Sequence, residues 1–102
     1  MIKILQTSVF KKIIKKLHSN QKKLLDDAVL AIADSPLIGE AKAGDLANIR
    51  IYKFKMLDQI TLLAYQYDEE RSLVKLLALG VHENFYRDLK TNIKNSVNNI
   101  DI

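Results

Sequence analysis

The first third of the chain is patterned as two helices, because apolar residues recur every three or four positions and lysines fill many of the positions between them. Thr7 or Ser8 is expected to cap the first helix, and Ser19 the second. Ser35-Pro36 ends the second helix, since proline cannot donate a backbone hydrogen bond and disfavours helical angles in the residue before it. The pattern therefore predicts a helical hairpin. Its predicted inward-facing residues are Phe10, Ile13, Ile14, Leu17, Leu25, Ala28, Val29 and Ile32.

Alternating and near-continuous apolar runs predict strands on both sides of this hairpin. Residues 1–6 are patterned as a short strand with one wet face, and residues 37–45 as a loop without a phosphate-cradling glycine pattern. Three further strands follow, over 46–57, 60–67 and the apolar run 73–79, joined by short links at Asp58-Gln59 and Asp68-Glu69-Glu70. Short links favour an antiparallel meander, with the helical hairpin covering one face.

The strand over 46–57 has two chemically different faces. Arg50 shares one face with the apolar side chains of Tyr52, Phe54 and Met56. Because those apolar residues are expected to face the core, Lys53 and Lys55 must point to the opposite side.

The chain turns polar after the last apolar strand, which breaks at Gly80. A helix is expected from about His82 through Leu89 and Ile93, and residues 95–102 are polar enough to fray. The predicted fold class is therefore α+β, with an N-terminal strand, a helical hairpin on a small antiparallel sheet and a short C-terminal helix, in a single domain over 1–102.

Composition and charge limit the function classes. The 102 residues are 48% hydrophobic and 27% charged, which suits one core, and the absence of cysteine excludes disulfides and thiolate chemistry. No apolar segment approaches the roughly 20 residues of a transmembrane helix, so a cytoplasmic protein without membrane contact is expected. Through Lys23 the chain carries seven lysines and no acid. This basic surface suits a phosphate backbone or an acidic protein, or it is an ordinary solvated helix face.

Four chemically active side chains follow Gly80. On a helix starting near His82, residues 82 and 86 stand one turn apart, as do residues 83 and 87, so His82, Glu83, Tyr86 and Arg87 would gather at the end of a strand. Proton transfer and anion binding could be combined there. The alternative is a solvated helix start, with Glu83 near the positive helix terminus.

Four segments, in order, resemble the toxins of the RelE/ParE superfamily from type II bacterial toxin–antitoxin modules: DSPLIGEAKAGDL, IYKFKM, LLAYQYDEE and LLALGVHENFY. HENFYRDLK in particular is similar to one ParE-like branch. The resemblance covers nearly the whole chain and implies the α+β fold of that superfamily. Its members divide into ribosome-dependent messenger RNA endonucleases and inhibitors of DNA gyrase, so the fold alone leaves the activity open.

The resemblance also implies a set of site residues. Lys53 and Lys55 fall on the paired lysines of RelE-type toxins, His82 on the basic residue near the end of the last strand, and Tyr86 near the C-terminal tyrosine. The arginine that these enzymes usually carry in the preceding strand falls on Leu62, which cannot bind phosphate.

RNA cleavage by transesterification would need a base, an acid and cations, but no metal or cofactor. His82 suits either proton-transfer role, Glu83 could act as base or hold His82, and Tyr86 could orient His82 or stack on a base of the RNA. Lys53 and Lys55 would stabilise the phosphorane, with Arg50 or Arg87 replacing the cation missing at Leu62.

The partners expected from the resemblance are an acidic antitoxin encoded nearby, together with the ribosome and messenger RNA. DNA gyrase is the alternative target, in which case the protein is a non-catalytic inhibitor. The third hypothesis is a small basic protein-interaction module without toxicity.

Overall fold

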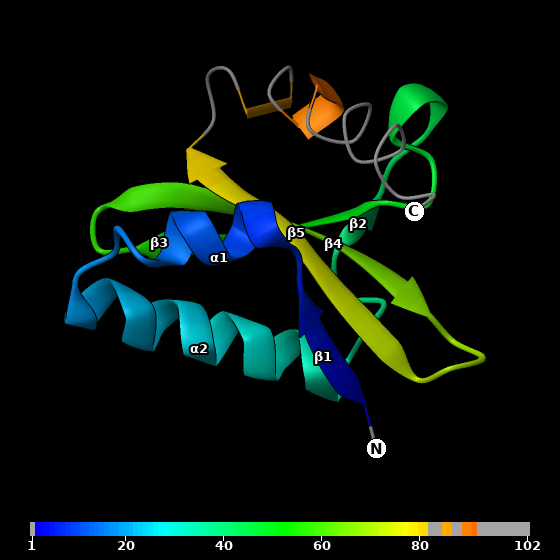
Figure 1. Cartoon of the computed structure of the whole chain (residues 1–102), viewed down its shortest axis with the longest axis horizontal. Helices are drawn as coiled ribbons and strands as arrows, with labels where there is room; N and C mark the ends of the chain where they lie inside the picture. Colours follow the sequence, from blue (N-terminus) through cyan, green and yellow to red (C-terminus); the bar gives the residue numbers. More distant parts are fainter. Residues whose placement is uncertain (1, 82–84, 87–88, 92–102) are drawn as a thin grey trace.

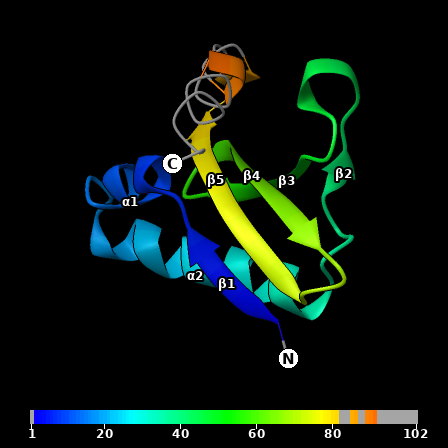
Figure 2. The same ribbon diagram turned by 45° about the vertical axis from the view of Figure 1, so that its right-hand side comes forward.

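A mixed five-stranded sheet with two helices against one face forms the body of the protein (Figures 1 and 2). The computed structural model describes residues 2–81, 85–86 and 89–91. The strand order is β1-β5-β4-β3-β2. The elements are β1 Lys3–Gln6, α1 Ser8–Ile14, α2 Ser19–Asp34, β2 Glu40–Ala41, a 3₁₀ turn Gly44–Leu46, β3 Arg50–Met56, β4 Gln59–Asp68 and β5 Leu73–Val81.

The helical hairpin is confirmed. Thr7 is the N-cap of α1, and its hydroxyl accepts a hydrogen bond from the Phe10 backbone N–H at 3.1 Å. The predicted cap of α2 was wrong by one residue, because His18 is the N-cap and its backbone N–H donates to the Gln21 side chain at 2.8 Å. The main core lies between the hairpin and the sheet. Its buried members are Phe10, Leu25, Ala28, Ile32, Met56, Leu63, Tyr65, Val74, Leu76 and Leu79.

The antiparallel meander β3-β4-β5 is also confirmed, with shifted boundaries. Leu46 belongs to the 3₁₀ turn, so β3 begins at Arg50 rather than at residue 46. The β3–β4 turn is formed by Leu57 and Asp58, because Met56 pairs with the residue at position 59. Between Ala64 and Tyr65 the register with β5 shifts by one residue, which leaves Leu77 of β5 without an opposite residue and marks a bulge in β5.

Two pairings enlarge the predicted sheet. β1 runs parallel to β5, with Lys3 opposite Leu73, and therefore forms one edge. β2 lies inside the segment expected to be a loop and pairs antiparallel with β3, with Glu40 opposite Ile51. Two residues are too few to produce a recognisable strand pattern, which is why this pairing was missed.

The second face of the sheet carries a smaller apolar cluster. Residues 85–86 and 89–91 are helical, as predicted, and Phe85 and Leu89 are buried against the sheet. The expected fraying of 95–102 lies outside the described residues. The buried members of this second cluster are Leu46, Ile49, Ile51, Leu62, Ala64, Ala78, Phe85 and Leu89.

Candidate functional site

Lys53 and Lys55 extend from β3 into solvent on the face opposite the helical hairpin. Both lysines are exposed, whereas Tyr52, Phe54 and Met56 of the same strand pack toward the hairpin core, as the alternation predicted. The face that carries Lys53, Lys55 and the second apolar cluster is called the lysine face below.

Leu62 lies directly beside Lys53 in the sheet. The register places Lys53 opposite Leu62 and Leu62 opposite Gly80, so the three positions form one row on the lysine face. The Leu62 side chain is fully buried in the second cluster. A buried leucine therefore occupies the position where the resemblance implies an arginine.

Tyr86 is held over the lysine face by its neighbour Phe85. A Cβ atom on Gly80 would lie 3.0 Å from the Phe85 ring, so the glycine lets this ring approach the sheet. The Tyr86 ring packs edge-on against Phe85, with 5.5 Å between the ring centroids, and it is half-buried against the second cluster. The structure therefore places Tyr86 and the two lysines on the same face of the sheet.

Glu40 and Lys42 join this face, although the sequence pattern did not indicate them. The Lys42 Nζ atom pairs with a Glu40 carboxylate oxygen and lies 5.4 Å from the centroid of the Tyr86 ring. Both residues come from the segment expected to be a loop. The available signal was two opposite charges two positions apart between glycines, which is too common a pattern to mark a site.

Mutual attraction shifts the titration of this pair. The pKa of Glu40 is lowered, first by its hydrogen bond with Lys42 and then by the Lys42 charge, with Lys53 adding to the effect. The pKa of Lys42 is raised, chiefly by its hydrogen bond with Glu40, and Tyr86 contributes in the same direction. The Glu40 carboxylate is therefore influenced by both Lys42 and Lys53, and Lys42 in turn interacts with Tyr86.

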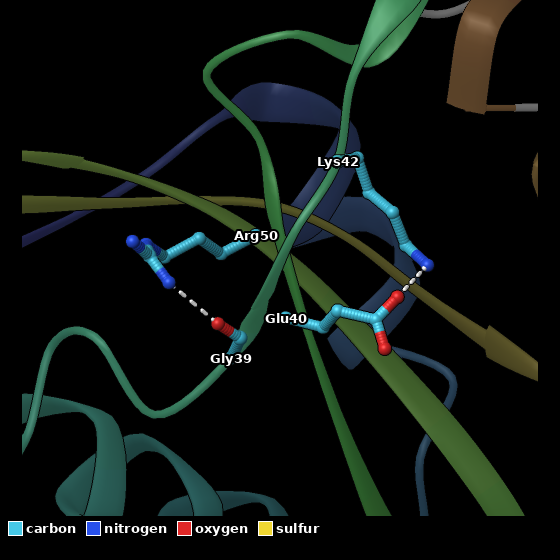
Figure 3. A network of polar contacts seen from close by, with 4 residues as sticks. All are labelled: Gly39, Glu40, Lys42 and Arg50. Atoms are coloured by element: carbon cyan, nitrogen blue, oxygen red, sulfur yellow. Dashed lines mark hydrogen bonds and ion pairs between the residues drawn. The ribbon is translucent and has the colours of Figure 1, made fainter.

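Arg50 is directed away from Glu40 and Lys42. Figure 3 shows its guanidinium on the other side of the segment that carries the Glu40–Lys42 pair. Its Nη1 atom donates to the carbonyl of Gly39 at 2.7 Å and to that of Leu37 at 3.2 Å. These bonds give Arg50 a structural role, because they fasten the segment leading into β2.

His82, Glu83 and Arg87 lie outside the described residues, so their predicted roles remain predictions. Among the described residues, no group of three or more histidine, aspartate or glutamate side chains could hold a metal ion. Within the same part of the chain, no helix is long and apolar enough to cross a membrane.

A helical hairpin on one face of a β-meander and a lysine pair on the other agree with the arrangement that the resemblance to RelE/ParE toxins implies. The chain belongs to the family of ParE-like toxins of type II bacterial toxin–antitoxin systems, whose profile matches residues 4–90. Among curated proteins no match was found.

Solved structures share this fold at low sequence identity. The intact E. coli RelBE toxin–antitoxin complex is similar with a TM-score of 0.66 and 23% identity, covering 81% of this chain and 99% of that chain. A double-arginine variant of E. coli toxin RelE in the free state gives a TM-score of 0.71 and 18% identity, covering 92% and 96%. A conserved hypothetical protein from Helicobacter pylori gives 0.57 and 23%, covering 80% and 96%.

Proposed function

We propose that this toxin is a ribosome-dependent messenger RNA endonuclease that inhibits translation in the cytoplasm. The observation that carries the proposal is the lysine face, where Lys53 and Lys55 are exposed on the same side of the sheet as a half-buried Tyr86. Two amines on one strand can hold a phosphodiester, and an aromatic side chain on the same face can stack on a base of the RNA. The likeness to RelE supports the proposal through the fold.

The proposed reaction is a transesterification within the RNA. The ribose 2′-oxygen loses its proton to a base and bonds to phosphorus, and the bond to the 5′-oxygen breaks as an acid protonates that oxygen. A 2′,3′-cyclic phosphate and a free 5′-hydroxyl result. His82 and Glu83 are proposed for proton transfer, with Tyr86 orienting the base or the substrate. Lys53, Lys55 and Arg87 are proposed to stabilise the charge that develops on phosphorus.

The test is cell-free translation of a defined messenger RNA, with the RNA ends mapped after toxin addition. Wild-type toxin should produce new ends only when ribosomes are present, and Lys53→Ala with Lys55→Ala should reduce cleavage by roughly 100-fold or more. Lys22→Ala with Lys23→Ala is the matched control, because it removes two exposed lysines from α2. Intact RNA with wild-type toxin would refute the proposal.

Inhibition of DNA gyrase is the second candidate, and Leu62 is the observation that favours it. A fully buried leucine leaves that row of the lysine face without the cation that the resemblance implies for RNA cleavage. Assays of gyrase supercoiling in the presence of the toxin separate the two functions. Blocked supercoiling with intact messenger RNA would establish the inhibitor.

The proposed protein partner is an acidic antitoxin. The surface that supports this proposal is a groove between α1 and the β3–β4 hairpin, which is lined by apolar side chains and by two lysines. This groove has a volume of about 320 Å³. It suits an amphipathic segment with acidic flanks. Its lining includes the apolar residues Ile13, Leu17, Met56, Leu79 and Val81 and the lysines Lys12 and Lys16.

Charge reversal tests this antitoxin surface. Lys12→Glu with Lys16→Glu should weaken binding of the antitoxin encoded beside the toxin by more than tenfold in a titration, because like charges would face each other. Lys22→Glu with Lys23→Glu, on the neighbouring helix, is the control. Equal affinities for the two variants would exclude this groove as the docking surface.

A further inference from the structure

Backbone pairing between β2 and β3 places the Lys42 side chain on the lysine face. The Lys42 backbone N–H donates to the carbonyl of Ile49 at 3.0 Å, which continues the β2–β3 pairing beyond Ala41. Glu40 stands opposite Ile51, and Lys53 follows two residues later on the same face of β3. Glu40, Lys42 and Lys53 therefore project from adjacent strands onto one surface.

The Glu40 carboxylate is an anion held by the Lys42 amine on this surface. One of its oxygens lies 2.5 Å from the Lys42 Nζ atom. The Lys42 side chain is 24% exposed, whereas that of Glu40 is 67% exposed, so the carboxylate lies on the solvent side of the pair. A phosphodiester approaching from solvent would meet this carboxylate first. It would also compete with the carboxylate for the Lys42 amine, because both anions accept hydrogen bonds from an ammonium group.

Lys42 also contacts the tyrosine of the candidate site. Its Nζ atom lies 5.4 Å from the centroid of the Tyr86 ring, within the range of a cation–π contact. The amine is therefore restrained from two sides, by Glu40 and by Tyr86. A cation held in this way is preorganised, so little side-chain entropy remains to be lost when an anion binds.

We propose that Lys42 is a third phosphate-binding amine of the toxin and that Glu40 is an internal anion which the RNA phosphodiester displaces. The inference rests on the proposed function and adds a residue to it. It gives the described part of the site a third cation, beside Lys53 and Lys55, although position 62 is a buried leucine. Glu40 keeps the Lys42 charge compensated while no RNA is bound.

Opposite effects of two substitutions distinguish this role from simple loss of charge. Lys42→Ala should weaken binding of single-stranded RNA about tenfold and reduce the salt slope by about 0.7, as expected for one lost phosphate contact. Glu40→Gln should strengthen binding severalfold, because the competing negative charge is removed while the side-chain shape is kept. Lys42→Arg should retain the wild-type salt slope.

The experiment measures fluorescence anisotropy of a labelled, fully 2′-O-methylated single-stranded RNA, which cannot be cleaved because its 2′-oxygens are blocked. Each variant is titrated at several salt concentrations after urea unfolding has verified that it is folded. Lys23→Ala is the control for Lys42→Ala. Asp45→Asn is the control for Glu40→Gln, because Asp45 is an exposed acid paired with Lys90.

The outcomes separate this inference from the proposed function. If Lys53→Ala weakens RNA binding but Lys42→Ala behaves as Lys23→Ala does, the role of Lys42 is overturned and the proposed function stands. If Glu40→Gln weakens binding, Glu40 is a structural support and the displacement is overturned. If the wild-type protein neither binds this RNA nor cleaves messenger RNA on ribosomes, both are overturned.

Discussion

The Tyr65 hydroxyl fastens the segment that carries Glu40 and Lys42, and Tyr65→Phe tests how strongly. Tyr65 is fully buried in β4. Its hydroxyl donates to the carbonyl of Pro36 at 2.7 Å and accepts from the backbone N–H of Gly39 at 2.9 Å. Removing one oxygen atom therefore breaks two hydrogen bonds and leaves a buried N–H group without its partner.

The expected loss in the free energy of unfolding follows from those two hydrogen bonds. Each contributes about 1 kcal/mol net, and a buried donor left unsatisfied costs about 1–3 kcal/mol. Because Gly39 is buried and Pro36 is half-buried, we expect Tyr65→Phe to lower the free energy of unfolding by roughly 2–3 kcal/mol. Urea unfolding followed by circular dichroism measures this value, and the m-value should not change.

Tyr67→Phe is the matched control on the same strand. Tyr67 is half-buried, and its hydroxyl makes no hydrogen bond with the described part of the chain. Its loss should change the free energy of unfolding by less than about 0.5 kcal/mol. Equal stabilities of the Tyr65→Phe and Tyr67→Phe variants would refute the assigned role of the Tyr65 hydroxyl.

A second substitution examines the same contact from the other side. A Cβ atom on Gly39 would lie 2.7 Å from the Tyr65 hydroxyl oxygen, so Gly39→Ala must push the segment away from β4. The two substitutions should be non-additive, because Tyr65→Phe removes the atom that clashes most closely. Strict additivity of their unfolding free energies would show that the two residues do not act on each other.

Three further predictions concern stability. Leu57→Gly in the β3–β4 turn should raise the free energy of unfolding by about 0.5–1 kcal/mol, because Leu57 has a φ of 58° that strains a side chain; a lower midpoint in urea would contradict this. Thr7→Ala should cost about 1–2 kcal/mol, since its hydroxyl caps α1 and also donates to the Leu77 carbonyl at 3.2 Å; Thr7→Ser, which keeps the hydroxyl, should recover most of the loss. Burial raises the pKa of Tyr65 above its ordinary value of 10.0, so above that pH the unfolded chain releases a proton that the folded protein retains, and stability falls as pH rises. Urea unfolding at alkaline pH should show a smaller fall for Tyr65→Phe.

Local patterns predicted the parts of the structure that depend on local chemistry. Alternation along β3 was sufficient to place Lys53 and Lys55 in solvent, because the apolar residues that alternate with them face the hairpin core. Short links predicted the meander, and proline at position 36 predicted the end of α2. Each of these features depends on residues that are close in the sequence.

Long-range contacts were not accessible from the same patterns. Lys42 and Tyr86 meet because the two-residue strand β2 pairs with β3 and because Phe85 packs on Gly80. No periodicity encodes such a meeting. Arg50 was grouped with the phosphate-binding residues because of its charge, although the alternation already placed it on the face opposite Lys53 and Lys55. Its two carbonyl acceptors emerge only from the folded chain.

The parallel pairing of β1 with β5 affects when the sheet can form during synthesis on the ribosome. The first strand of the chain bonds to the last, and the Thr7 hydroxyl donates to a carbonyl 70 residues further on. At synthesis rates of about 5–20 residues per second, several seconds pass between the synthesis of β1 and that of β5. The complete sheet, and with it the lysine face, therefore forms only after β5 has been synthesised.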